Sequence, residues 1–154
     1  MAAFYLESSA LVKRYSTETG SNFVIGLMRP SAKNRFYSAK ITEVEVCAAL
    51  ARKRKGLKIS AASAAKSLLR FRRNFAGSFN KPDLTDSIVS EAIRLTEHHA
   101  LRGYDAVQLA TALETNRKRL SDGLSALIFV SADTELNNAA QAEGLDIENP
   151  NNYP

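Results

Sequence analysis

The sequence has little of several residue types, and each shortage narrows what the chain can be. Cys47 is its only cysteine, so no internal disulfide can form, which is typical of a protein in a reducing cytoplasm. Its apolar runs are short: the stretch 126–130 falls far below the roughly 18 residues that a membrane span needs. The N-terminus also lacks a basic region followed by a long apolar stretch, which a secretory signal requires. We therefore expect a cytoplasmic protein with no membrane partner.

The chain also shows no internal repeat, no low-complexity tract and no linker-like segment. It has 154 residues, 45% of them hydrophobic. That is enough for one ordinary core, because compact domains typically run to about 100–150 residues. We predict a single domain over residues 1–154.

Acidic residues are missing from one long window of the chain. From Arg52 to Lys81 there are ten Lys or Arg residues and no Asp or Glu, in a protein of net charge +5. A basic surface of this kind attracts phosphate backbones. The same pattern is also typical of a solvated helix face that keeps a protein soluble. Charge alone leaves both interpretations open.

The pattern of apolar residues predicts short strands separated by helices. Ser8 or Ser9 is expected to be the N-cap of the first helix. Alternation of strands and helices indicates an α/β fold, a three-layer α/β/α sandwich with a central parallel sheet. Strands are expected at 2–6, 35–38, 127–130 and 145–147, and helices from 8 until the Thr19-Gly20 interruption and at 21–28, 41–55, 60–74, 84–98, 104–117 and 133–143. In the helix 41–55, the apolar face is expected at Ile41, Val44, Ala48 and Ala51.

Four acidic residues are expected at the same edge of that sheet. Glu7 closes the first strand and Asp133 lies three residues beyond Val130. In open parallel sheets, ligands bind beyond the carboxyl ends of the strands. Glu45 and Asp105 stand in the first turns of two helices that should face this edge. Taken singly, each acid also suits an ordinary surface position or a first helical turn, where the helix dipole favours negative charge.

Their expected convergence favours a metal site. Two unpaired carboxylates about 4 Å apart repel by roughly 4 kcal/mol at an effective dielectric of about 20, so four in one cleft require cations. Oxygen ligands suit Mg²⁺ or Mn²⁺, and such ions activate water and stabilise a departing phosphate oxygen. An acidic metal cleft in a net basic protein indicates a phosphodiester enzyme. We therefore predict that the metal-binding and catalytic residues are Glu7, Glu45, Asp105 and Asp133.

Four segments of the chain resemble the motifs of PIN-domain nucleases of the VapC toxin type. They are FYLESSALVK (4–13), ITEVEVCAALAR (41–52), LRGYDAVQLA (101–110) and FVSAD (129–133), in the family's order and across nearly the whole chain. The resemblance implies a PIN-like fold and Mg²⁺- or Mn²⁺-dependent cleavage of RNA. It also implies a cognate antitoxin as partner and a homodimer. Ser9 and Ser131 would support the acids by hydrogen bonding.

Two positions depart from the pattern that this family usually has. Glu7 stands where the family usually has Asp, and the extra methylene moves the carboxylate oxygens by about 1.5 Å. Magnesium demands near-ideal octahedral geometry, so the shift can weaken binding or alter the rate. Gln108 stands where a His is common, a change with no interpretation from sequence.

The basic residues offer a surface for RNA. Those expected to contact it are Arg52, Arg54, Lys55, Arg70, Arg73 and Arg102, the last beside Asp105. Antitoxin binding is an equally good reason for this basic surface. His98 and His99 are adjacent at a helix end, with no partner spacing for catalysis, so surface or capping roles are expected.

Two further functions remain as alternatives. One is a non-catalytic PIN-like module that binds RNA or protein, in which the Glu7 change has weakened metal binding. The other is a phosphoryl-transfer or receiver-type site, which is disfavoured because no Asp-x-Asp pair follows the first strand and no phosphate-cradling glycine-rich loop is present.

Overall fold

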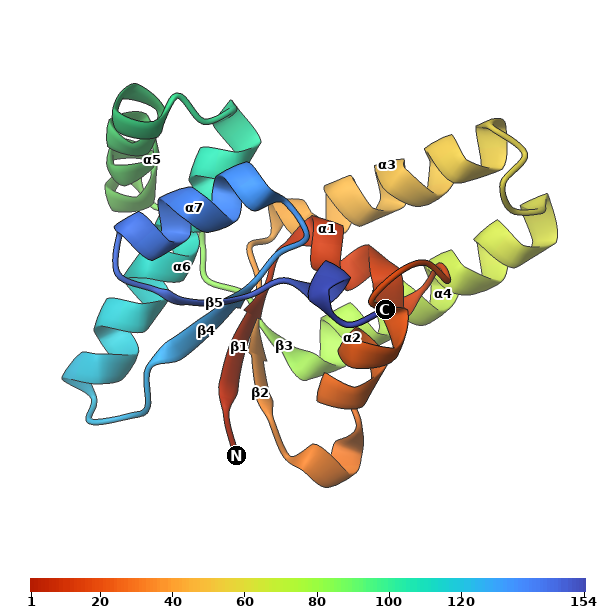
Figure 1. The fold of residues 1–154 in the computed structure, drawn as a ribbon, viewed down its shortest axis with the longest axis horizontal. Helices are drawn as coiled ribbons and strands as arrows, with labels where there is room; N and C mark the ends of the chain where they lie inside the picture. Colours follow the sequence, from red (N-terminus) through yellow and green to blue (C-terminus); the bar gives the residue numbers. More distant parts are fainter.

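Five short strands form one parallel sheet in the computed structural model, which describes residues 1–154. The order across the sheet is β3-β2-β1-β4-β5, and helices cover both faces (Figure 1). This confirms the predicted three-layer α/β/α fold with a central parallel sheet. None of the helices combines the length and the apolar character that crossing a bilayer requires.

The strands are β1 (Ala3–Leu6), β2 (Arg35–Tyr37), β3 (Phe79–Asn80), β4 (Leu127–Val130) and β5 (Asp146–Glu148). The helices are α1 (Ser8–Leu11), α2 (Ser21–Leu27), α3 (Ile41–Lys55), α4 (Ala61–Ser78), α5 (Asp86–His99), α6 (Gly103–Ser121) and α7 (Thr134–Ala142), with short 3-10 helices η1 (Val12–Arg14), η2 (Pro30–Ala32) and η3 (Pro150–Asn152).

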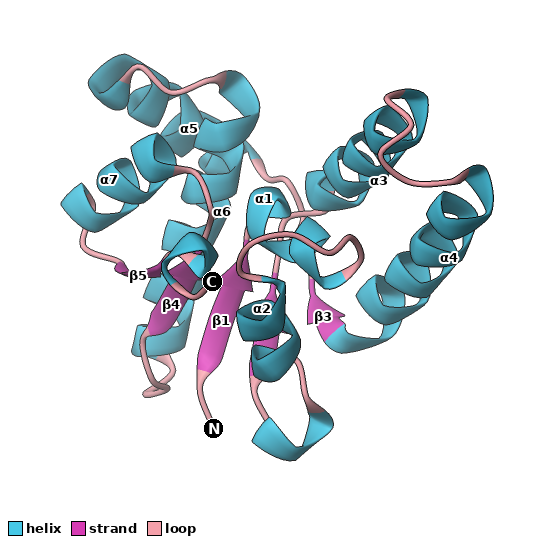
Figure 2. Ribbon diagram, turned by 45° about the vertical axis from the view of Figure 1, so that its right-hand side comes forward, coloured by secondary structure: helices cyan, strands magenta, loops and turns pink.

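The central strand β1 separates two hydrophobic cores. All four of its residues are buried, and successive side chains point to opposite faces of the sheet. Ala3 and Tyr5 belong to the core beneath α5, α6 and α7, while Phe4 and Leu6 belong to the core beneath α1, α3 and α4. Figure 2 shows the sheet between these two groups of helices. Burial on both faces explains why β1 is apolar throughout rather than alternating.

The buried face of α3 differs from the predicted one. Val44 is 65% exposed, whereas Thr42, Val46 and Leu50 are the buried residues of this helix. The prediction was wrong because apolar residues occur almost all around this helix between 41 and 51, so several faces fit a spacing of three and four. Contact with α1 and α4 determines which face is buried, and Leu50 packs in the second core.

Two smaller predictions were also wrong, and one strand was missed. The N-cap of α1 is Glu7 rather than Ser8 or Ser9, because the Glu7 carboxylate accepts a hydrogen bond from the Ser9 backbone N–H. Helix α4 continues past residue 74, since Phe75 is fully buried one turn beyond Phe71 and extends its apolar face. Strand β3 was not predicted, because its two residues are too few to show a period.

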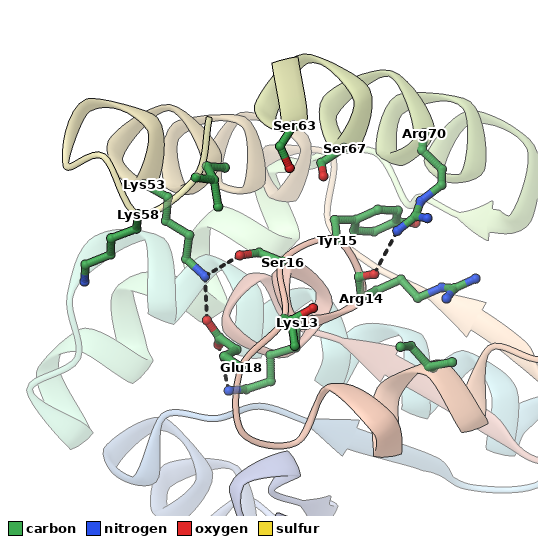
Figure 3. Close-up of a pocket in the computed structure, with 13 residues that line it drawn as sticks. Lys13, Arg14, Tyr15, Ser16, Glu18, Lys53, Lys58, Ser63, Ser67 and Arg70 are labelled. Carbon is green, nitrogen blue, oxygen red and sulfur yellow. Dashed lines mark hydrogen bonds and ion pairs between the residues drawn. The ribbon is translucent and has the colours of Figure 1, made fainter. Parts of the chain in front are cut away.

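The long hairpin of α3 and α4 is tied to the segment after η1 by an ion pair between Lys53 and Glu18 (Figure 3). Lys13 is 5% exposed, and its Nζ lies 2.8 Å from Glu18 Oε1. Lys53 of α3 reaches the other oxygen of Glu18 at 2.6 Å and donates to the Ser16 hydroxyl at 2.8 Å. Burial raises the pKa of Glu18, but hydrogen bonds from the two lysines outweigh it and hold the pKa below its usual value. Through Lys53, these contacts join α3 to the segment that follows η1.

Candidate metal centre at the carboxyl edge of the sheet

The sheet topology brings the carboxyl ends of β1 and β4 together. β1 is the central strand, with β2 on one side and β4 on the other, so the crevice between β1 and β4 is the topological switch point. Glu7 directly follows β1, and its backbone N–H donates to the Val130 carbonyl at 3.0 Å. Asp133 lies three residues beyond β4, as N-cap of α7. Both acids therefore lie at the position where an open parallel sheet binds ligands.

Glu7 is held by donors from two separate segments. Its side chain is 3% exposed. The Ser8 hydroxyl donates to Oε1 at 2.5 Å. Oε2 accepts from the Ser9 backbone N–H at 3.0 Å, from the Ser9 hydroxyl and from the Ser131 hydroxyl at 3.0 Å. Oε2 is thus saturated, and Oε1 keeps a free lone pair, because a carboxylate oxygen has about two acceptor positions.

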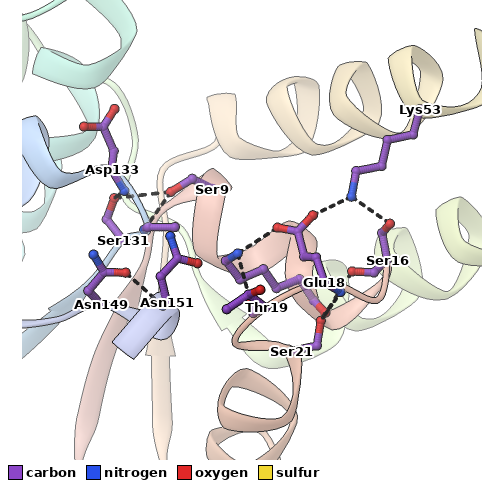
Figure 4. A network of polar contacts seen from close by, with 12 residues as sticks. Ser9, Ser16, Glu18, Thr19, Ser21, Lys53, Ser131, Asp133, Asn149 and Asn151 are labelled. Atoms are coloured by element: carbon purple, nitrogen blue, oxygen red, sulfur yellow. Dashed lines mark hydrogen bonds and ion pairs between the residues drawn. The ribbon is translucent and has the colours of Figure 1, made fainter. Parts of the chain in front are cut away.

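The segment after β4 is fixed by the same serines (Figure 4). The Ser131 hydroxyl accepts from the Asp133 backbone N–H at 3.1 Å, and the Ser9 hydroxyl accepts from the Ala132 backbone N–H at 2.9 Å. Asp133 Oδ1 caps α7 by accepting from the Leu136 backbone N–H at 3.0 Å. Asp133 thus has the ordinary capping position that sequence also allowed, but its second oxygen makes no hydrogen bond within the protein and can bind an ion.

Glu45 reaches the edge from α3, next to a buried glutamine. Gln108 of α6 is 0% exposed, and its Nε2 donates to Glu45 Oε1 at 2.6 Å. Burial raises the pKa of the Glu45 carboxyl, the charges of Glu7 and Asp105 raise it further, and the bond from Gln108 opposes both. Glu45 is therefore a partly buried acid with two like-charged neighbours.

The orientation of the Gln108 amide follows from its partners. The Tyr5 hydroxyl accepts the Ala39 backbone N–H at 3.0 Å, which leaves its own proton for Gln108 Oε1 at 2.7 Å. The NH₂ group of Gln108 must then face Thr42 Oγ1, at 2.8 Å, and Glu45. Because Tyr5, Thr42 and Gln108 are all fully buried, this network holds Glu45 from beneath the sheet edge. Sequence reasoning did not find this network.

Asp105 completes the group of four acids. Burial raises the pKa of the Asp105 carboxyl, and the charges of Glu7 and Asp133 raise it further, against a smaller opposing effect of Arg102. No Lys, Arg or His forms an ion pair with any of the four carboxylates. Glu45 and Asp105 therefore have raised carboxyl pKa values, caused first by burial and then by neighbouring acids, and no cation forms an ion pair with either of them.

The donor set fits a hard divalent cation. Every candidate ligand atom is a carboxylate oxygen, the kind that Mg²⁺ and Mn²⁺ prefer. No three of the four acids bring their oxygens within 4.8 Å of one another, so they do not form a closed cage. Such an open arrangement suits Mg²⁺, which usually keeps several water ligands and binds through only one or two carboxylates.

The basic residues proposed for RNA are exposed, but most lie away from the acids. Arg52, Arg54 and Lys55 end α3, seven to ten residues beyond Glu45, which is about 10–15 Å along the helix. Arg70 and Arg73 lie on α4, with Arg70 stacked over the Tyr15 ring at 5.5 Å. Only Arg102, the N-cap of α6, is beside an acid, namely Asp105.

Beside this hairpin lies a basic hollow that sequence reasoning did not find. It has a volume of about 730 Å³, and its walls come from η1, the following segment, α3 and α4 (Figure 3). Lys53, Lys58 and Arg70 line it, with the Lys13–Glu18 pair at its base. Lys13 and Lys53 are engaged by Glu18, so Lys58 and the arginines supply its free positive charge.

Comparisons with known proteins agree with the motifs. The PIN domain model matches residues 4–142. The ribonucleases VapC45 and VapC49 of Mycobacterium tuberculosis are each 31% identical to this chain over 144 residues, which is 94% of this chain and 93% of theirs.

Solved structures share the fold at low sequence identity. The VapBC2 structure from Rickettsia felis, bound to a promoter DNA fragment, superposes with a TM-score of 0.61 at 12% identity, covering 96% of this chain and 98% of that one. FitAB bound to the IR36 DNA fragment gives 0.61 at 13% identity, over 96% and 94% of the two chains. A toxin–antitoxin complex from Klebsiella pneumoniae gives 0.56 at 17% identity, over 97% and 98%. The family model and the 31% identity to the two mycobacterial proteins show that the chain belongs to the PIN-domain family.

Proposed function

We propose that this chain is a metal-dependent endoribonuclease toxin that acts in the cytoplasm and is neutralised by a cognate antitoxin. The observation that carries the proposal is that burial and the charges of acidic neighbours raise the pKa of Glu45 and of Asp105, while no ion pair offsets this. A bound Mg²⁺ or Mn²⁺ would neutralise that charge. The two mycobacterial relatives are ribonucleases by name, and they align with nearly the whole chain.

Each acid would have a distinct share in holding the ion. Glu7 offers Oε1, since the serines occupy Oε2. Asp133 offers the oxygen that does not cap α7, and Glu45 is oriented by Gln108. When bound, the ion activates a water for attack on a phosphodiester and stabilises the leaving oxygen. Arg102, exposed beside Asp105, would contact the phosphate of the substrate.

The test is RNA cleavage by purified protein free of any partner. We expect cleavage with Mg²⁺ or Mn²⁺, loss of cleavage with a chelator, and loss in Asp105→Asn. Asp146→Asn is the matched control, because Asp146 is an exposed Asp at the start of β5, the opposite end of the strands. Full activity of Asp105→Asn would show that the site is assigned wrongly.

The non-catalytic alternative has its own signature. If Glu7 has abolished turnover, the wild-type protein will not cut RNA with either ion, while Glu7→Asp will. If the proposal is right, the wild-type protein cuts, and Glu7→Asp cuts less well. Shortening the side chain by about 1.5 Å pulls it away from either the Ser9 N–H or the Ser131 hydroxyl.

The antitoxin would be a protein with an apolar segment. A shallow groove between α3 and α4 is lined by Val44, Cys47, Ala48 and Leu68, and Val44 is 65% exposed. Exposed apolar surface of this kind is typical of a protein interface. Two of the structural neighbours are VapBC2 and a toxin–antitoxin complex. We expect growth arrest on expression, rescue by the neighbouring gene, and loss of that rescue in Val44→Asp while RNA cleavage persists.

The proposal includes a homodimer, and the mass of the purified chain in solution by light scattering tests it. A monomeric mass of 16.9 kDa at working concentration would contradict the dimer but leave the nuclease assignment intact.

A further inference from the structure

Two histidines and one glutamate converge at the ends of α5 and α7. His98 and His99 are the last residues of α5, and Glu143 is the C-cap of α7. One ligand atom from each residue lies within 4.8 Å of the other two, the only such group of three in the structure. These are also the only two imidazoles in the chain. The group shares no residue with the four acids at the sheet edge.

The geometry points to a transition-metal site: we propose that His98, His99 and Glu143 bind one Zn²⁺ ion, with water as the fourth ligand. Two imidazoles, one carboxylate and a water form a ligand set that zinc takes in proteins. Imidazole nitrogen favours zinc over Mg²⁺, which prefers oxygen ligands. The proposal is independent of the ribonuclease assignment.

The distances allow the site to close by side-chain rotation. Zinc bonds to nitrogen and oxygen are about 2.0–2.2 Å, so neighbouring ligands in a tetrahedron are about 3.3 Å apart. The widest separation here is within 4.8 Å. His98 is exposed, with its ring 4.6 Å from that of His99, and no hydrogen bond holds it in place. Rotation of His98 alone can therefore bring the third ligand in.

The other two ligands already face each other. His99 Nε2 lies 2.8 Å from Glu143 Oε1, and their side chains are 14% and 17% exposed. A zinc ion would take the place of the proton between these two atoms, and zinc binding would release that proton to solvent.

Arg94 of α5 competes for Glu143 but does not block it. Its NH2 donates to Oε2 at 2.9 Å, and NH1 reaches Oε1 at 3.2 Å. The same guanidinium holds Glu91 at 2.8 Å, so Arg94 remains paired when Oε1 turns to an ion. A hydrogen bond to the second oxygen is the kind of outer partner that ligating carboxylates usually have.

The ion would join α5 to the end of α7 that lies opposite Asp133. Glu143 lies ten residues beyond Asp133, about 15 Å along the axis of α7. Zinc at this position would stabilise the packing of the two helices without entering the acidic centre.

Zinc titration in the presence of millimolar Mg²⁺ tests the proposal, because Mg²⁺ competes for the carboxylate site. We expect one Zn²⁺ per chain and a rise in Tm of about 5–10 °C at a hundredfold excess over Kd. Both imidazole rings should shift in ¹⁵N spectra, which hold only these two rings. His98→Ala should weaken zinc binding at least about tenfold.

Two controls make the result decisive. Glu97→Gln alters the exposed residue beside His98 and should leave zinc affinity unchanged, as should Asp105→Asn at the acidic centre. Zinc affinity that is unchanged in His98→Ala, or a Kd weaker than about 100 μM in the wild-type protein, would overturn the proposal. RNA cleavage by His98→Ala with Mg²⁺ should equal that of the wild-type protein, so failure of one proposal is distinguishable from failure of the other.

Discussion

Replacing Gln108 by leucine tests whether the buried network positions Glu45 or only fills space. Leucine keeps a similar volume but removes both polar ends of the amide. The Tyr5 hydroxyl then has no acceptor for its proton, and Glu45 loses the donor at 2.6 Å. Since that donor opposes the rise in the pKa of Glu45, the carboxyl pKa moves further up. Thr42 loses one partner but still lies 2.8 Å from the Ser38 hydroxyl.

The two losses have different sizes. A buried polar group without a partner costs about 1–3 kcal/mol, and Tyr5 is 0% exposed. Glu45 is only partly buried, so water can replace much of its lost bond. We estimate a total of about 2 kcal/mol, or a fall in Tm of about 4–8 °C in a chain of this size. Loss of a residue that orients a ligand typically weakens metal binding about 10–100-fold.

The assay is RNA cleavage titrated with Mg²⁺, followed by a pH profile. Gln108→Leu should need more Mg²⁺, and the acid limb of its profile should move to higher pH because Glu45 must ionise to bind the ion. Thr115→Val on the same helix is the control, since Thr115 is buried but bonds only within α6. The double variant Tyr5→Phe/Gln108→Leu should lose less stability than the sum of the single variants. Wild-type Mg²⁺ dependence in Gln108→Leu would refute the positioning role.

Three further variants probe the same edge and its support. Ser131→Ala removes one donor to Glu7, so Tm should fall by about 2–4 °C and cleavage should need more Mg²⁺. A Mg²⁺ titration equal to that of the wild-type protein would contradict this. Because the pKa of Asp105 is raised, the folded protein binds the proton of this carboxyl more tightly than the unfolded chain does. The stability of the metal-free protein therefore falls as pH rises past the usual carboxyl pKa. Asp105→Asn should remove this dependence of stability on pH and raise the metal-free Tm by about 1–3 °C at pH 7. The lowered pKa of Glu18 gives the opposite pH dependence, because stability is lost as pH falls below about 4.5. Glu18→Gln leaves Lys13 buried without its partner and should cost about 1–2 kcal/mol, a figure reduced because Glu18 is 34% exposed. Its Mg²⁺ affinity should be unchanged.

The elements that could be predicted are those with a local signal. The run Leu127–Val130 is a strand with the predicted bounds, and the helix predicted at 41–55 has the same bounds in the structure. The position of Glu7 and Asp133 followed from one general fact, that parallel strands end at the same edge. A strand end can be read from the sequence, so an acid directly after it can be placed without knowing any contact.

The contacts that orient those acids could not be predicted, because their partners are distant in the chain. Tyr5 and Gln108 are 103 residues apart, and Glu7 and Ser131 are 124 apart. One signal was present: Gln108 is a polar residue between the apolar Val107 and Leu109 of a helix that packs on the sheet. That position indicates burial, but a buried amide has many possible partners, and only the fold selects Glu45.

The Glu7 side chain shows why replacing the family's usual Asp need not remove the proposed metal site. Its length lets one carboxylate cap α1 through the Ser9 N–H and still reach the Ser131 hydroxyl beyond β4. Four donors hold it, three of them on Oε2, so the charge stays at the switch point with little freedom to move. The hydrogen bonds to Oε2 therefore leave one oxygen of Glu7, Oε1, for an ion. A site with fewer fixed ligands leaves more positions to water, as Mg²⁺ usually prefers.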